Sequence, residues 1–128
     1  MSNKKMKHQE YELQCQFCQL LDYHNIFYFA VPNQEVRGGT ELQRIIAYKR
    51  LKKSGNKKGA SDLVIVLKNK VVFCEMKTEK GKQSEEQKDF EKKVKELGHE
   101  YIVLHNIDDC LNFIKFFARK HSGSLAVE

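Results

Sequence analysis

The chain has 128 residues, of which 41% are hydrophobic and 31% charged, and its formal net charge is +6. This length and balance predict one domain over residues 1–128 that buries a core without disulfides or metal, and they exclude a disordered chain. The apolar stretches are too short for a membrane span, and the N-terminal MSNKKMKHQE has no apolar segment of a signal peptide, so we expect a cytoplasmic protein with reduced cysteines.

The start of the chain predicts a helix and then a strand. The helix covers about residues 10–23, because apolar residues recur there at helical spacing. These residues are Leu13, Phe17, Leu20 and Leu21. Cys15 and Cys18 fall inside this helix, and no second pair follows at zinc-like spacing, so we expect buried free thiols rather than a zinc or redox pair. The apolar run IFYFAV, residues 26–31, predicts a strand that Pro32 ends.

A second predicted helix carries most of the positive charge. It follows Gly38-Gly39, with Thr40 as a possible N-cap, and its apolar stripe is expected to pack on the sheet. The stripe consists of Leu42, Ile45, Ile46 and Leu51. The stretch from residue 44 to 58 has no acidic residue, and its cations are Arg44, Lys49, Arg50, Lys52, Lys53, Lys57 and Lys58. Such a field favours a polyanion such as nucleic acid, although charge alone fits a solvated helix face equally well.

The rest of the chain predicts two strands, a helix, a strand and a helix. The strands span about 62–67, 71–77 and 101–105, a helix starts at Ser84 and stops at Gly98, and the last helix spans 108–120. The residues expected in the core are Cys74, Phe90, Val94, Leu97, Cys110, Leu111, Ile114 and Phe117. We therefore expect an α/β fold, a mixed sheet flanked by helices in α-β-α-β-β-α-β-α order. Its core spans about 10–118, and a disordered tail covers 121–128.

The two central strands place charged residues on one face of the sheet. A turn at Lys68-Asn69 sets Asp62 opposite Glu75, and a turn at Asn69-Lys70 sets Asp62 opposite Lys77. Either register puts all three on one face, whereas a three-residue loop would not. Carboxylates about 5 Å apart repel unless a cation lies between them. The alternative is a set of exposed charges at strand ends, worth at most ~1 kcal/mol.

Two more polar residues point toward the same place. Glu10 lies on the apolar stripe of the first helix, where an acid is unusual, although it also suits the positive end of the helix dipole. Gln87 lies on the apolar stripe of its own helix. It also completes a capping box with Ser84, so a capping role and a role in a site remain equally open.

These residues occur in an order that resembles a known family. GASDLVIV followed by VVFCEMKTEKGKQSEEQ is similar to the virus-type replication-repair nuclease (VRR-NUC) domain, a branch of the PD-(D/E)xK nucleases. The residues that match its motifs are Gly59, Asp62, Leu63, Glu75, Lys77, Gly81, Ser84 and Gln87. The similarity extends from about Glu10 to Phe117. Ser61 departs from the pattern, because it stands where the family usually has proline.

The resemblance implies a restriction-endonuclease-like core and DNA hydrolysis with Mg²⁺ or Mn²⁺. Asp62, Glu75 and the Met76 carbonyl would hold the metal, and Lys77 would orient the attacking water. Glu10 and Gln87 would complete the pocket. The cations of segment 44–58 would bind phosphates. Asn33 would bind DNA with them, because it matches the Pro-Asn that follows the family's first strand. Members of this size are common in bacteria and phages, so the compartment would be a bacterial or phage-infected cell.

The expected activity is therefore structure-selective DNA cleavage. Stand-alone members tend to be homodimers, and some behave as junction-resolving enzymes, so four-way (Holliday) junctions are the expected substrate. The alternatives are a flap- or end-processing nuclease, a restriction-type endonuclease, or a catalytically silent DNA-binding module. A protein-interaction domain is a further alternative, which leaves the basic segment without a purpose.

Overall fold

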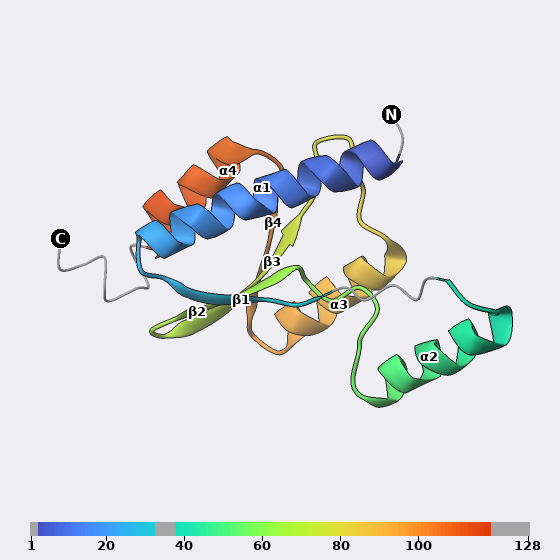
Figure 1. The fold of residues 1–128 in the computed structure, drawn as a ribbon. Helices are drawn as coiled ribbons and strands as arrows, with labels where there is room; N and C mark the ends of the chain where they lie inside the picture. The colour runs from blue at the N-terminus through green and yellow to red at the C-terminus, as the bar shows by residue number, and fades with distance from the viewer. Residues whose placement is uncertain (1–2, 33–37, 119–128) are drawn as a thin grey trace.

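The computed structural model describes residues 3–32 and 38–118, which form four helices and a four-stranded mixed sheet (Figure 1). In chain order the elements are α1 (Asn3–Tyr23), β1 (Phe27–Ala30), α2 (Glu41–Lys53), β2 (Leu63–Leu67), β3 (Lys70–Met76), α3 (Glu85–Glu96), β4 (Glu100–Leu104) and α4 (Ile107–Asn112), which continues as the π-helical segment η1 (Phe113–Ala118). The predicted order of helices and strands is confirmed. The predicted tail lies outside the described residues.

The sheet has the order β1-β2-β3-β4, so β2 and β3 are its central strands. β1 pairs antiparallel with β2, and β2 pairs antiparallel with β3 through a two-residue turn. β3 and β4 are parallel, and α3 provides the crossover between them. A parallel pair needs such a crossover, because the chain must return to the same end of the sheet.

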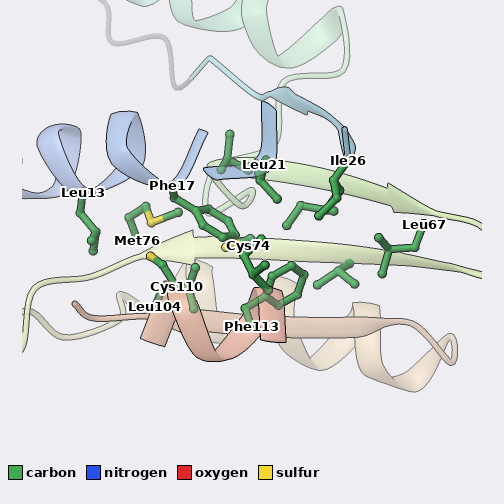
Figure 2. Packing of buried hydrophobic residues seen from close by; sticks show 14 residues of the cluster. Leu13, Phe17, Leu21, Ile26, Leu67, Cys74, Met76, Leu104, Cys110 and Phe113 are labelled. Carbon is green, nitrogen blue, oxygen red and sulfur yellow. The ribbon is translucent and has the colours of Figure 1, made fainter. Parts of the chain in front are cut away.

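Helices α1 and α4 cover one face of the sheet and form the main core with it. Figure 2 shows side chains of α1, the strands and α4 meeting in this layer. The ring of Phe17 packs edge-on against Phe113 at a centroid distance of 5.6 Å. Cys74 and Cys110 are buried there as predicted, whereas Cys15 and Cys18 are only half-buried. All four are free thiols.

Helix α3 covers part of the opposite face. The ring of Phe90 lies 5.8 Å from that of Phe73 on β3 and 6.2 Å from that of Tyr101 on β4. Val94 is buried one helical turn further on. Because side chains alternate along a strand, Glu75 lies on the same face as Phe73 and therefore under the start of α3.

The expected burial of the α2 stripe is wrong. α2 forms where predicted, with Thr40 in a capping box, but it has no buried residue. Leu42, Ile45 and Ile46 are exposed, and Leu51 is half-buried. Figure 1 shows α2 standing apart from the layers formed by the sheet and the other helices. A helical pattern predicts which residues share a face, but it does not supply a surface for that face to pack on.

Three smaller differences concern the other helices. α1 begins at Asn3 rather than near Glu10, because the added stretch NKKMKHQ contains three lysines, a methionine and a glutamine, which favour a helix without an apolar stripe. Leu97 is exposed, since α3 ends one residue before it. Leu111 is also exposed, because the last helix buries the stripe that runs through Cys110 and Ile114. Within residues 3–32 and 38–118, no helix is long and apolar enough to cross a membrane.

Candidate functional site

The β2–β3 hairpin brings the two predicted carboxylates together. Its turn is Lys68-Asn69, and Leu63 pairs with Cys74, so the next position places Asp62 opposite Glu75. Of the two predicted two-residue turns, the structure has Lys68-Asn69, which places Asp62 opposite Glu75. The two carboxyl groups share a side-chain hydrogen bond. The pair therefore lies at the end of β2 and β3, on the face that α3 covers.

Asp62 also closes the end of the hairpin. Its Oδ2 accepts a hydrogen bond from the backbone N–H of Met76 at 2.8 Å, where the ladder would otherwise need a partner from β2. In an antiparallel ladder, the N–H and the carbonyl of one residue point to the same neighbouring strand. The Met76 carbonyl therefore points to the edge of β3 at which Asp62 lies. Two carboxylates and one carbonyl are thus gathered at this point.

Glu75 is buried, with 2% of its surface exposed. Its Oε2 accepts a hydrogen bond from Gln87 Nε2 at 3.1 Å, and its Oε1 accepts one from the Tyr101 hydroxyl at 3.4 Å. Burial, and next the nearby charge of Asp62, raise the pKa of Glu75 to about 9. A carboxyl with this pKa is neutral at pH 7 unless a cation joins it.

Lys77 and Glu10 extend the site beyond the carboxyl pair. The N–H of Lys77 donates to the Leu104 carbonyl at 3.0 Å, which continues the strand pairing and keeps the lysine on the face of Glu75. Glu10 reaches the same place from α1, where it accepts a hydrogen bond from the backbone of Thr78. Burial raises the pKa of Glu10, while the charge of Lys77 opposes that rise for both Glu10 and Glu75.

Gln87 has both of the roles that its position allowed. Its Oε1 accepts a hydrogen bond from the Ser84 N–H at 2.9 Å, and the Ser84 hydroxyl accepts one from the Gln87 N–H, so the capping box is formed. The Nε2 of the same amide donates to Glu75. One end of the amide caps α3, and the other end fixes the carboxylate.

These side chains line a cleft of about 1080 Å³. α1, α2, the loop before β2 and the start of α3 supply its walls, and the carboxyl pair lies within it. The lining residues are Lys7, Glu10, Tyr11, Gln14, Tyr48, Leu51, Lys52, Asn56, Lys57, Lys58, Gly59, Ala60, Asp62, Glu75, Lys77, Ser84 and Gln87. The five residues expected to be catalytic are therefore all in one cleft.

The basic segment is divided between the cleft and the outer surface of α2. Three of its cations, Lys52, Lys57 and Lys58, line the cleft, and Lys58 lies 3.8 Å from Glu86 at the start of α3. The other four lie on α2 away from the cleft lining. These are Arg44, Lys49, Arg50 and Lys53, and the Arg44 guanidinium donates to the Gly39 carbonyl at 2.8 Å. Asn33 lies outside the described residues.

Sequence reasoning missed several residues of the site. Tyr101 touches Glu75 only because of the parallel register of β3 and β4, and no sequence signal gives that register. Burial and the charge of Glu75 raise the pKa of Tyr101, so its hydroxyl remains a donor. The sequence could have predicted that Lys7 and Gln14 belong to the site, because they share a helical face with Glu10.

The donor atoms fit a hard divalent cation. Among the described residues, no three acidic, histidine or cysteine side chains converge as a metal cluster, so Glu10 lines the cleft without joining Asp62 and Glu75 as a ligand group. Mg²⁺ is commonly held by one or two carboxylates and keeps several waters, a requirement that this pair and the Met76 carbonyl meet. A bound cation would also favour the ionised form of Glu75, which burial disfavours.

Comparisons of the chain with protein-family models, curated proteins and solved structures give no match.

The two roles of Gln87, capping α3 and contacting Glu75, can be separated by two substitutions. We expect Ser84→Ala and Gln87→Ala each to lower the free energy of unfolding by about 1 kcal/mol, because each breaks the capping box. Only Gln87→Ala removes the amide from Glu75, so only this variant should lose the DNA cleavage that the VRR-NUC resemblance implies, by roughly tenfold or more. Chemical denaturation measures the first effect, and metal-dependent cleavage of a labelled branched DNA measures the second. Equal cleavage rates in the two variants would contradict the contact with Glu75.

Gly59 fixes the loop that forms the edge of the cleft. Its φ is +88°, and a Cβ would lie 2.4 Å from the Glu86 carbonyl, so the loop packs directly on the first turn of α3. Gly55 also has a positive φ, of +101°, but a Cβ at Gly55 would point into open space, with no neighbouring atom within 4 Å. We expect Gly55→Ala to cost about 1–2 kcal/mol of stability from backbone strain alone. Gly59→Ala should cost at least ~1 kcal/mol more, as measured by denaturation, and equal losses would contradict the close contact.

Proposed function

We propose that the protein is a divalent-metal-dependent DNA endonuclease that selects branched structures and acts as a homodimer on four-way junctions. The observation that supports this most is the pairing of buried Glu75 with half-buried Asp62, with Lys77 in the same cleft. The order of these residues resembles the VRR-NUC pattern, and with it we propose a restriction-endonuclease-like core. A carboxyl pair that only stabilised the fold would not require a cleft lined by lysines around it.

The reaction proposed is hydrolysis of a phosphodiester bond. Asp62, Glu75 and the Met76 carbonyl would hold Mg²⁺ or Mn²⁺, which would polarise the phosphate and lower the pKa of a bound water. Lys77 places a positive charge where negative charge develops on the phosphoryl oxygens, and its ammonium can donate a hydrogen bond to the attacking water. Water adds to phosphorus as one P–O bond breaks, which leaves a phosphate monoester and a hydroxyl.

The remaining polar groups prepare the carboxylates for this role. Gln87 and Tyr101 donate to the two oxygens of Glu75, so its carboxylate is held in one orientation. The Met76 N–H does the same for Asp62. Partners of this kind orient metal ligands and raise their affinity. The lysines that line the cleft would contact phosphates, which positions DNA without reading its sequence.

A cleavage assay tests this proposal. Labelled linear duplex, flap and four-way junction DNA are incubated with the protein in Mg²⁺ or in EDTA. We expect cleavage in Mg²⁺ alone, fastest on the junction, and a dimer in sedimentation. Absence of metal-dependent cleavage on every substrate would overturn the nuclease proposal. Fastest cleavage of the flap would favour end processing, equal cleavage of linear duplex would remove structure selectivity, and a monomer would remove the symmetric two-site arrangement.

A further inference from the structure

Two exposed tyrosines line the cleft and have no part in the chemistry described above. Tyr11 of α1 is 66% exposed and Tyr48 of α2 is 53% exposed. Among the described residues, neither ring packs against another aromatic ring. Large aromatic side chains left in water beside a functional cleft are available to bind a ligand.

Each tyrosine shares its helical face with other residues of the cleft. Tyr11 lies one turn after Lys7 and one turn before Gln14, and Tyr48 lies one turn before Lys52. The two walls of the cleft therefore each offer an aromatic ring next to an ammonium group. Alternating cations and aromatic rings are typical of grooves that bind single-stranded nucleic acid, in which cations contact the backbone and rings stack on bases.

Whether the two tyrosine rings can stack on a base depends on whether that base is paired. In a duplex, neighbouring base pairs cover the faces of each base, and a protein reaches only base edges and the backbone. An unpaired nucleotide presents its free face, and stacking on an aromatic ring is nearly independent of sequence. The rings of Tyr11 and Tyr48 can therefore stack on a base in this cleft only when that base is unpaired.

We propose that Tyr11 and Tyr48 form a stacking subsite for unpaired nucleotides beside the scissile phosphate. This inference rests on the proposed function, because the same cleft holds the carboxyl pair. It narrows the substrate class to branched DNA with unpaired nucleotides next to duplex arms, as at the opened branch point of a four-way junction, and a flap presents the same unpaired nucleotides. Fully paired DNA would contact the lysines and leave both rings unused.

The chain offers matched variants for the test. Leucine keeps most of the side-chain bulk without a π face, and phenylalanine keeps the ring without the hydroxyl. Tyr23 is the control, because it lies on α1 and is 80% exposed but does not line the cleft. Binding of the full chain to a labelled flap DNA and to the fully paired duplex is measured by fluorescence anisotropy in EDTA, where no cleavage is expected.

We expect Tyr11→Leu and Tyr48→Leu each to weaken binding to the flap about 5- to 100-fold, the range for loss of one base–aromatic stack. Binding to the paired duplex should stay within about twofold, the phenylalanine variants should bind as the unaltered chain does, and Tyr23→Leu should have no effect. Equal losses on both DNAs, or no loss on the flap in either leucine variant, would overturn the subsite.

The two proposals fail in different ways. Tyrosine-dependent binding to the flap without metal-dependent cleavage would support the stacking subsite and overturn the nuclease. Metal-dependent cleavage with tyrosine-independent binding would overturn the subsite alone. No binding to either DNA would overturn both.

Discussion

We expect Glu75→Gln to abolish metal-dependent cleavage and, in the same protein, to stabilise the metal-free fold. Glutamine has the shape of a neutral glutamic acid, and its amide nitrogen can donate a hydrogen bond to Asp62. Its single amide oxygen can accept from either Gln87 or Tyr101, which donate to the two oxygens of Glu75. Glutamine carries no charge, however, and therefore contributes little to holding a divalent cation. Loss of one of the two carboxylates proposed to hold the metal should lower the cleavage rate by about 10³-fold or more.

The stability effect depends on pH in a defined direction. Burial raises the pKa of Glu75 from 4.5 to about 9, so ionisation of this side chain disfavours the fold. The contribution of Glu75 to the stability of the fold is therefore most favourable below pH 4.5 and is lost as the pH rises toward 9. Glutamine does not ionise, so the advantage of Glu75→Gln should grow over this range, to on the order of 2 kcal/mol at pH 8.

Thermal unfolding in EDTA from pH 5 to pH 9 measures this advantage, which corresponds to a Tm increase of roughly 5–10 °C at the upper end. Added Mg²⁺ should reduce this difference in Tm between Glu75→Gln and the unaltered chain, because Mg²⁺ stabilises only the protein that binds it. Glu96→Gln, at the end of α3, is the matched control and should change neither property. A Glu75→Gln protein that is less stable than the unaltered chain at pH 8 would contradict the account of a buried Glu75 whose ionised form disfavours the fold.

The second large effect is expected from Lys77→Ala. Lys77 supplies positive charge in the cleft beside Glu75 and Glu10, and its loss should slow cleavage about 10²- to 10⁴-fold. Its backbone bond to Leu104 remains, so the fold should remain as well. DNA binding in EDTA should weaken only slightly, since several other lysines line the cleft.

Lys82→Ala is the control for this variant. Lys82 follows Gly81 in the same loop, is exposed, and does not line the cleft, so the substitution should leave cleavage within about threefold. Single-turnover rates on junction DNA measure both variants. Equal rates for Lys77→Ala and the unaltered chain would remove Lys77 from the chemistry.

The sequence was most informative where local geometry is sufficient. Side-chain alternation and a short turn were enough to place Asp62 and Glu75 on one face, and the structure added which of two registers is formed. Helix periodicity placed Gln87 and Glu10 on inward-facing stripes, and both reach the cleft. Each of these predictions depends on residues that are close in sequence or on a single turn.

Prediction was less successful for features that depend on packing between residues far apart in the sequence. The apolar face of α2 was expected to be buried, but it is exposed, because periodicity cannot tell whether a partner surface exists. Tyr101 contacts Glu75 through the register of a parallel pair, and this register depends on how α3 crosses between β3 and β4. The division of the basic segment, with Lys52 in the cleft and Arg44 outside it, likewise follows from the position of α2.

Direct metal binding is the measurement closest to the central claim, that Asp62 and Glu75 form a cation site. Mn²⁺ is titrated into the metal-free chain and followed by electron paramagnetic resonance, with Asp62→Asn and Glu75→Gln alongside. We expect saturable binding by the unaltered chain and a loss of affinity of about 10-fold or more in each variant. Absence of Mn²⁺ binding, or equal affinity in all three proteins, would contradict the claim.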